Sequence, residues 1–441
     1  DHMYIPELGH NVSVTDYAHT LYIRASWTDF NPQEDVYGWK IDSNLRAYIE
    51  GAYQRNMRLA FRVVVDSRDK RTEFTPQFVK DAGAKGFMNK GKWSPYSDDP
   101  VFQKYYTKFV KALAKDFNDP SKVEFIDGFG LGKWGEYHTM IYSTGDDTPK
   151  KAVFDWVTDI YSQAFDKVPV VINYHRWIGA GKDWVDDEHF AADSEEMLEG
   201  AIKKGYSLRH DAFGMTTYYG SWERRFAKKY RNICPIIMEG GWIVKSHSYW
   251  QDPRGYRKDS HEDVRRGEFD DSKEAHVNMM DFRFGDTESW FKDAFDLVRR
   301  FLREGGYRLY PSEISLPLEV SKKTTPTIKH CWNNLGWGYC PTNIPQWNQK
   351  YKVAFALLDS ETNEARYTFV DTDTDLSKWI KGSPVEYVFE PDMSKVETGT
   401  YVWAVGVVDR SNKDLVGLDI AAKGDILDSG WLKLSKVSIN K

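Results

Sequence analysis

The sequence predicts an α/β domain followed by an all-β domain, and three observations support this. From Leu21 to Arg303, short apolar runs alternate with stretches of helical periodicity. No Gly-rich phosphate loop opens a helix, which disfavours an open nucleotide-binding sheet. After Pro311 the helical periodicity disappears, and β-like runs recur between turn signals. We therefore expect a (β/α)8 TIM barrel over residues 1–311 and an immunoglobulin-like β-sandwich over residues 312–441.

The barrel strands are expected where short apolar runs are almost continuous, because parallel strands are covered on both faces. These runs are residues 21–27, 59–65, 123–130, 168–173, 213–218 and 233–238, with a weaker one at 278–283. Helices are expected between them, most clearly where Phe102, Tyr106 and Phe109 recur at helical spacing. No first strand is evident before Thr20, so either the chain begins after it or residues 3–14 supply it.

Charge and cysteine content exclude several classes of protein. Lys and Arg number 60 against 66 Asp and Glu, a net charge of −6, so no basic excess favours nucleic acid as a partner. No apolar run approaches the ~18 residues of a membrane-spanning helix. Three cysteines are too few for a disulfide framework or a four-cysteine zinc site. Cys331 and Cys340 either form one disulfide or remain free, and we expect no metal and no cofactor.

Aromatic residues are unusually frequent, with 17 Trp, 26 Tyr and 24 Phe making up 15% of the chain. Leu, Ile and Val would fill a core as well, so the surplus rings need a second explanation. Flat rings with a polar edge suit a surface that binds sugars, and they equally suit a protein interface. Composition alone leaves both explanations open.

The active site of a barrel lies at the carboxyl ends of its strands, so the residues that end each apolar run are the candidates. After the run that ends at Phe129 comes a glycine-rich segment in which Glu136 lies between Trp134 and Tyr137. Partial desolvation would raise the pKa of such a carboxyl group, as a general acid requires. The alternative is a glycine-rich loop with an incidental glutamate.

A second carboxylate, Glu239, ends the run Pro235–Met238 and is followed by two glycines and Trp242. A carboxylate at the end of a buried strand is costly unless it is paired or functional. A structural salt bridge is the alternative here.

Two arginines, Arg24 and Arg62, lie within otherwise apolar runs and need anions if they are buried. Arg24 could keep Glu239 ionised. Equally, both arginines could form core ion pairs with Asp66 or Asp127. The sequence does not decide between the two.

Two carboxylates on different strands of one barrel mouth are the apparatus of glycoside hydrolysis. One protonates the leaving oxygen, while the other attacks the anomeric carbon or activates water. A separation of about 5–5.5 Å between them gives retention of configuration, and a wider one gives inversion.

The segments Arg24–Trp27, Asn31–Glu34, Tyr37–Trp39 and Leu59–Val65 resemble the early barrel of clan A glycoside hydrolases, the four-seven superfamily. The resemblance implies an acid/base glutamate after strand four and a nucleophile after strand seven. Counting from strand two at Leu21, these positions are Glu136 and Glu239. Gly135 departs from the asparagine that many members have before the acid/base. The whole chain is similar to multi-domain bacterial polysaccharide-degrading enzymes such as endo-β-1,3-glucanases.

Further strand-end residues are candidates for contact with substrate. They are Arg24, Trp27, Arg62, Trp134, His138, Asn173, His175, Tyr218, Trp222 and Trp242. The resemblance implies that Tyr218 touches the nucleophile. The cluster from Asn173 to Arg176 could instead be a hydrogen-bonded loop, and half of the tryptophans could be core residues.

We therefore predict a retaining glycoside hydrolase that cleaves a β-linked polysaccharide, with a β-glucan as the first candidate. The alternative is a non-catalytic protein that binds a polysaccharide or oligosaccharide on a glycosidase-like barrel. We expect a monomer that is secreted, periplasmic or on the cell surface of a bacterium, although no signal peptide is visible in the sequence.

Overall fold

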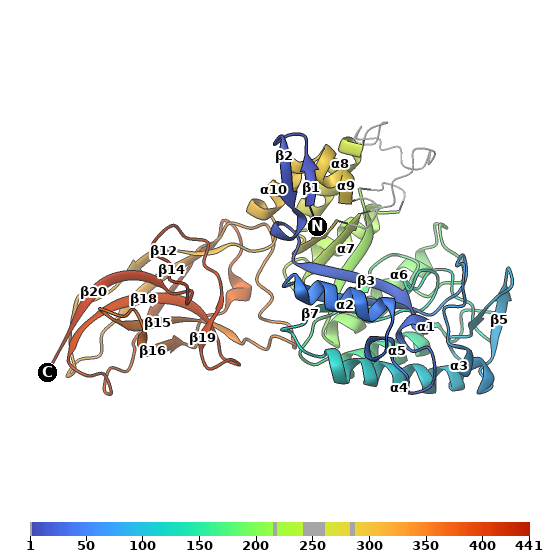
Figure 1. The fold of residues 1–441 in the computed structure, drawn as a ribbon, viewed down its shortest axis with the longest axis horizontal. Coiled ribbons are helices and arrows are strands. Elements are labelled where there is room, and N and C mark those ends of the chain that lie inside the picture. Colours follow the sequence, from blue (N-terminus) through green and yellow to red (C-terminus); the bar gives the residue numbers. More distant parts are fainter. Residues whose placement is uncertain (1, 215–217, 241–260, 283–286) are drawn as a thin grey trace. The chain divides into compact units, whose positions relative to one another are not determined.

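The computed structural model describes residues 2–214, 218–240, 261–282 and 287–441. The chain divides into two compact units (Figure 1). The first comprises residues 1–230, 236–275 and 280–298, and the second comprises 231–235, 276–279 and 299–441. No helix in the described part of the chain is long and apolar enough to span a membrane.

The first unit is built on a seven-stranded sheet in the order β11-β10-β9-β8-β7-β4-β3. Its strands are β3 (Thr20–Ser26), β4 (Arg58–Val64), β7 (Val123–Asp127), β8 (Val170–Asn173), β9 (Tyr206–Phe213), β10 (Ile236–Gly240) and β11 (Met279–Asp281). The pairings from β3 through to β10 are all parallel.

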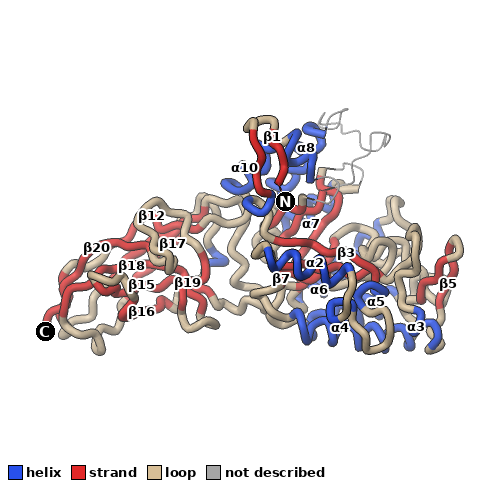
Figure 2. Tube along the Cα trace, in the orientation of Figure 1, coloured by secondary structure: helices blue, strands red, loops and turns tan. Residues whose placement is uncertain are grey.

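Helices connect these strands, as Figure 2 shows. They are α1 (Trp27–Phe30), α2 (Asn44–Gln54), α3 (Gln77–Asp81), α4 (Pro100–Phe117), α5 (Lys150–Ala164), α6 (Glu188–Lys203), α7 (Ser221–Tyr230), α8 (His261–Glu274), α9 (Thr287–Asp293) and α10 (Phe295–Glu304), with short 3-10 turns η1 (Val14–Asp16) and η2 (Gly38–Lys40). The clearest expected helix, α4, begins where Asp99 accepts a hydrogen bond from the Phe102 N–H at 2.8 Å. It buries the expected face of Phe102, Tyr106 and Phe109.

The strand order is sequential, with helices between successive strands, which is the arrangement of an α/β barrel and not of a doubly wound sheet. The predicted α/β class is confirmed, and the sheet fits seven of the eight strands of a TIM-like barrel. Among the described residues no eighth strand joins it. Residues 3–14 do not supply one, because they lie in the antiparallel hairpin β1 (His2–Ile5) and β2 (His10–Ser13). A second hairpin, β5 (Gly86–Asn89) and β6 (Lys92–Pro95), also lies apart from the sheet.

One strand prediction was wrong. The sixth barrel strand, expected at 213–218, is β9, which ends at Phe213. Its sequence carries Ser207, Arg209 and His210, so it has no continuous apolar run, and yet all three side chains are buried. The helical periodicity that ends at Arg303 is likewise divided between two helices, α9 and α10.

The second unit contains two sheets, and Figure 2 draws it almost entirely as strands and loops. One has the order β12-β14-β17, and the other has the order β13-β20-β18-β15-β16 with β19 on β18. The elements are β12 (Leu309–Ser315), β13 (Glu319–Ser321), β14 (Ile328–Asn334), β15 (Tyr351–Asp359), β16 (Ala365–Asp371), η4 (Leu376–Lys378), β17 (Val385–Phe389), β18 (Gly399–Asp409), β19 (Leu415–Leu418) and β20 (Leu432–Asn440). All pairings are antiparallel except β13 with β20.

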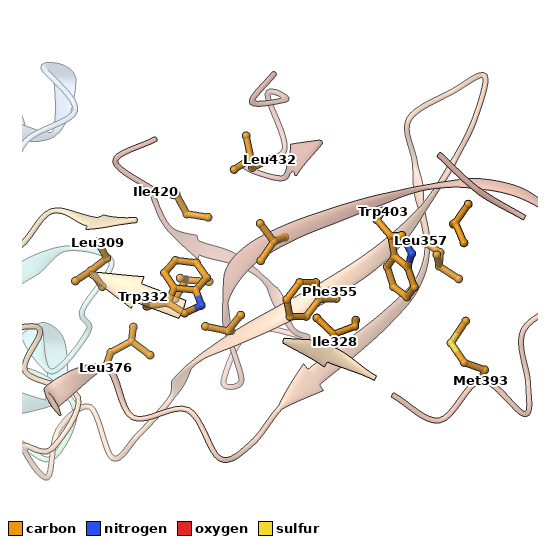
Figure 3. Close-up of a cluster of buried hydrophobic side chains, with 14 of the residues drawn as sticks. Leu309, Ile328, Trp332, Phe355, Leu357, Leu376, Met393, Trp403, Ile420 and Leu432 are labelled. Carbon is orange, nitrogen blue, oxygen red and sulfur yellow. The ribbon is translucent and has the colours of Figure 1, made fainter. Parts of the chain in front are cut away.

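The two sheets share one hydrophobic core, drawn in Figure 3. Trp332 of β14 lies in it with Phe355 of β15 and Trp403 of β18, all fully buried. Alternate residues of β15 are buried on its other face too, where Ala356 packs in a cluster with Trp431. All three cysteines are free, so Cys331 and Cys340 form no disulfide.

Replacing Phe355 by alanine should lower the free energy of unfolding by about 3–5 kcal/mol, because it leaves a cavity in this core. Urea-induced unfolding followed by circular dichroism measures the change. Val388→Ala is the control, since Val388 is 65% exposed and its truncation should leave stability nearly unchanged. Equal effects of the two substitutions would contradict the assignment of Phe355 to the core.

Candidate active site

Six charged side chains from five strands and one loop meet in the first unit, and we call them the charge cluster. They are Arg24 of β3, Arg62 of β4, Asp127 of β7, Glu136 of the loop after β7, Arg209 of β9 and Glu239 of β10. The Arg24 side chain is 24% exposed, and the other five are at most 4% exposed. All but one are therefore almost completely removed from water.

Strand register brings the first members of this cluster together. In the parallel pairing of β3 with β4, Arg24 lies opposite Arg62, and in the pairing of β4 with β7, Arg62 lies opposite Asp127. The three residues are therefore neighbours across three adjacent strands. Arg209 reaches the same place from β9, two strands further along the sheet.

Asp127 is the common acceptor that fixes two of the arginines. Its Oδ2 atom accepts hydrogen bonds from Arg62 Nε at 2.9 Å, Arg209 Nε at 2.8 Å and the Tyr22 hydroxyl at 2.9 Å. A guanidinium group is planar, so holding its Nε also directs its two Nη atoms. Asp127 thereby sets the orientation of both guanidinium groups.

The Nη atoms of these arginines bind the two glutamates. Arg62 donates from Nη1 to Glu136 Oε1 at 2.6 Å and from Nη2 to Glu239 Oε2 at 2.7 Å. Arg209 donates from Nη1 to Glu239 Oε2 at 2.8 Å and from Nη2 to Glu136 Oε1 at 3.2 Å. Arg24 donates to the other oxygen of Glu239. Glu239 thus contacts three guanidinium groups, and Glu136 contacts two.

Charge pairing accounts for the burial of the cluster. An isolated ion in a protein interior costs several kcal/mol, and partners with good geometry offset that cost. Here three guanidinium groups face three carboxyl groups, so the formal charges balance when all three carboxyl groups are ionised. Removing any one charge would leave an uncompensated charge in the interior.

The two glutamates nevertheless differ in environment. Burial raises the pKa of Glu136, and the negative charges of Asp211 and Glu239 raise it further, while Arg62 and Arg209 oppose the shift. The net direction is upward, so Glu136 keeps its proton to higher pH than an ordinary glutamate.

The loop that carries Glu136 depends on glycine. Gly130, Gly132 and Gly135 have φ values of 84°, 72° and 75°, which glycine adopts without strain. At Gly130, a Cβ atom would also lie 2.6 Å from the carbonyl oxygen of Val63. The loop therefore approaches the end of β4 closely enough for Glu136 to reach Arg62.

Beside the charge cluster lies a second group of polar residues from neighbouring strand ends. His175 donates from Nε2 to the backbone carbonyl of Glu136 at 2.9 Å and accepts at Nδ1 from the Trp177 N–H at 3.2 Å. Burial and the nearby His138 lower the pKa of His175, so it is a neutral imidazole with the proton on Nε2. His175 thus holds the backbone at Glu136 in place.

His138 stacks on His175 with ring centroids 4.0 Å apart. Its Nε2 lies 2.5 Å from the Tyr218 hydroxyl, and its Nδ1 lies 2.8 Å from Asp183 Oδ2. Burial disfavours the charged form of His138, but Asp183 and other carboxylates raise its pKa overall. Asn173 completes the group, donating weakly to the Tyr218 hydroxyl at 3.4 Å.

The structure brings together most of the residues predicted to form the site. Arg24, Arg62, Glu136 and Glu239 lie in the charge cluster, and His138, Asn173, His175 and Tyr218 lie beside it. Trp134 is 37% exposed on the loop of Glu136. Trp242 lies outside the described residues.

Two of the tryptophans predicted to contact substrate, Trp27 and Trp222, are buried. Trp27 is fully buried and packs against Phe78, Phe102, Tyr106 and Phe109, so its faces are covered. Trp222 is 7% exposed and stacks on Phe226 within α7. Both are core residues: the aromatic partners of Trp27 come from α3 and α4, and that of Trp222 comes from its own helix, α7.

The alternatives left open for the arginines are also decided. Arg24 pairs with Glu239, while Arg62 pairs with Asp127 and with both glutamates. Asp66 takes no part, because its carboxylate binds Arg68 at 2.5 Å.

Arg209 is the member of the charge cluster that the sequence analysis missed. It is fully buried and binds three carboxylates. The signal was present in the sequence, since Arg209 follows Leu208 in the same way as Arg24 follows Ile23. It was overlooked because β9 was placed too late in the chain.

No group of His, Cys, Asp and Glu suited to hold a metal ion occurs among the described residues. The charged groups of the charge cluster form ion pairs with one another. The chemistry that this arrangement can perform is acid, base and nucleophilic chemistry by carboxyl groups.

Comparisons with known proteins give structural likenesses only. No family model matches the chain, and no curated protein matches it. An endo-β-1,4-mannanase from Thermotoga petrophila aligns over 97% of this chain and 94% of its own, at 12% identity and a TM-score of 0.41. Endo-glycoceramidase II from Rhodococcus sp. aligns over 86% of this chain and 91% of its own, at 13% identity and a TM-score of 0.38. A trimodular GH5_4 subfamily endoglucanase aligns over 97% of this chain and 72% of its own, at 11% identity and a TM-score of 0.39.

Substitution of Asp127 by asparagine should lower the free energy of unfolding by about 3–5 kcal/mol, because three guanidinium groups would then face two carboxylates in the interior. Urea-induced unfolding measures it. The control is Glu50→Gln, which removes the charge of an exposed carboxylate paired with Arg46 on α2. That change should leave stability as it is, and a similar lack of effect at Asp127 would contradict the electrostatic account of the cluster.

Proposed function

We propose that the protein is a retaining glycoside hydrolase that cleaves a β-linked polysaccharide, with a β-glucan as the first candidate. Glu136 is the acid/base and Glu239 the nucleophile. The observation that carries the proposal is that one guanidinium group, that of Arg62, binds both carboxyl groups at the carboxyl ends of the strands.

The shared guanidinium supports retention. Nη1 and Nη2 of Arg62 are bonded to the same carbon atom, so the oxygens that accept from them lie at neighbouring positions. This arrangement favours the shorter separation of about 5–5.5 Å, typical of retaining enzymes, over the ~6.5–9.5 Å that admits a water molecule.

The different environments of the two carboxyl groups suit different roles. Three guanidinium groups contact Glu239 and stabilise the ionised carboxylate that a nucleophile must be. Burial and neighbouring carboxylates raise the pKa of Glu136, which keeps a proton available for the leaving group. Arg62 and Arg209 thus contact both the proposed nucleophile and the proposed acid.

The reaction would proceed in two steps. Glu136 transfers its proton to the glycosidic oxygen as Glu239 Oε attacks the anomeric carbon, which breaks the glycosidic bond and forms a covalent glycosyl ester. Glu136, now ionised, then takes a proton from water. The resulting hydroxide adds to the anomeric carbon, and Glu239 leaves as a carboxylate.

Asn173, His138 and Tyr218 offer hydrogen bonds to sugar hydroxyls beside Glu136. The two sheets and shared core of the second unit support an immunoglobulin-like β-sandwich. A polysaccharide substrate fits a monomeric enzyme that acts outside the cytoplasm of a bacterium.

Replacing Glu239 by glutamine should abolish reducing-end release from whichever β-glucan, galactan, mannan or xylan the wild type cleaves, because an amide cannot act as the nucleophile. Replacing Glu136 by glutamine should slow cleavage of the same polysaccharide about 10²–10⁴-fold. Proton NMR of the first product should show the β-anomer.

Full activity of Glu239→Gln would refute the proposal. Tight binding of one glycan by the wild type with no turnover would instead identify a glycan-binding protein. Unchanged folding of both variants, checked by circular dichroism, is required for either conclusion.

The pH dependence follows from the direction of the Glu136 shift. A raised pKa keeps the acid protonated to higher pH, so the basic limb of kcat/KM should lie above the ordinary glutamate value of about 4.3. In Glu136→Gln, assayed with a 4-nitrophenyl glycoside that needs no protonation, this limb should disappear. A limb that persists would assign it to another group.

A further inference from the structure

Exposed tryptophan is rare in this protein. Of the 17 tryptophans, Trp242 and Trp250 lie outside the described residues. Among the other fifteen, Trp134 and Trp184 are exposed, at 37% and 56%. The other thirteen described tryptophans are buried or half-buried, and these two indole rings are exceptions that need a reason.

Both exceptions have strained backbones. Trp134 has a φ of 60° and Trp184 a φ of 63°, in the left-handed region that bulky residues avoid. Such a conformation costs about 1–3 kcal/mol and persists only where the surrounding structure enforces it. A large apolar side chain held on the surface in this way is typical of a binding site.

The two rings flank the same residue. The Trp134 ring meets the His138 ring edge to face with centroids 5.7 Å apart. The Trp184 ring lies almost parallel to the His138 ring, 8° from it, with centroids 6.3 Å apart. They come from different loops, after β7 and after β8, and so converge beside Glu136.

The loop that carries Trp184 is held in place by hydrogen bonds of the residues before and after it. Asp183 accepts a hydrogen bond from the Thr139 hydroxyl at 3.0 Å and lies 2.8 Å from His138 Nδ1. On the other side, the carbonyl of Val185 accepts a hydrogen bond from the Trp177 indole at 2.8 Å. Trp184 is thus presented in a preorganised position, which reduces the entropy lost on binding.

We infer that Trp134 and Trp184 form a subsite for a pyranose ring of the glycan on the leaving-group side of the cleaved bond. This inference rests on the proposed function. An exposed indole offers a flat apolar face to the C–H groups of a sugar. The Lys133 ammonium lies over the Trp134 ring, 5.0 Å from its centroid, and pairs with Asp69 at 2.7 Å, so it offers a donor for hydroxyls at the edge of this subsite. The leaving-group side follows from position, since both rings surround the loop of the proposed acid.

The test combines binding and kinetics. Titration calorimetry with laminarihexaose, cellohexaose, mannohexaose and xylohexaose should show that the wild type binds at least one of them. Trp184→Ala should weaken that binding about tenfold or more, and Trp184→Phe, which keeps a flat ring, should largely restore it. Ile41→Ala, which truncates another exposed apolar residue of the first unit, is the matched control and should bind as the wild type does.

Kinetics then locate the subsite. With the bound hexasaccharide, kcat/KM of Trp184→Ala should fall about tenfold through a higher KM. With the glycosyl fluoride of the same sugar, whose leaving group is a single atom that does not reach the indoles, kcat/KM of Trp184→Ala should stay within about twofold of the wild-type value. An equal loss on both substrates, wild-type binding by Trp184→Ala, or no binding of any hexasaccharide by the wild type would overturn the inference.

The two proposals can fail separately. Hexasaccharide binding that depends on Trp184 without any hydrolysis would leave the subsite standing as a glycan-binding surface and refute the hydrolase. Hydrolysis by the wild type with unchanged kinetics in Trp184→Ala would do the reverse.

Discussion

The burial of three guanidinium groups among three carboxyl groups is the constraint on which the rest of the first unit depends. Asp127 Oδ2 binds the Nε atoms of Arg62 and Arg209, and this orients both toward Glu136 and Glu239. The parallel register of β3, β4 and β7 places the first members side by side. The glycine-rich loop after β7 is bent as it is because Glu136 must return to the same arginines.

The same arginines also leave the two glutamates in different surroundings. Both glutamates contact Arg62 and Arg209, but Glu239 has Arg24 in addition. Glu136 has ion pairs with Arg62 and Arg209 and lies in the field of Asp211. Burial and this negative charge outweigh the two arginines, and the pKa of Glu136 rises. Arg24 beside Glu239 and Asp211 near Glu136 thus distinguish the surroundings of the two glutamates.

Much of this site could be predicted from sequence because charged residues in apolar strands are conspicuous. Arg24 and Arg62 stand out in this way, Glu239 ends such a run, and Glu136 lies in the glycine-rich segment that follows one. Arg209 was missed since Ser207 and His210 interrupt the apolar pattern of β9, and pairing with carboxylates allows these polar residues to be buried. Which arginine binds which carboxylate depends on strand register, which composition does not encode. Trp27 is a core residue because of helix packing that the sequence alone did not fix.

The charge cluster also bears on how the first unit assembles. Arg24 and Glu239 are 215 residues apart in the chain, and Arg62 and Glu239 are 177 apart. Closing such long loops is slow, and the ion pairs form only when strands from both ends of the sheet are in place. Until then, any partly built sheet would hold unpaired charges in its interior and would be unstable. Intermediates that lack either end are therefore disfavoured, and the unit gains cooperativity from the same residues that form its candidate active site.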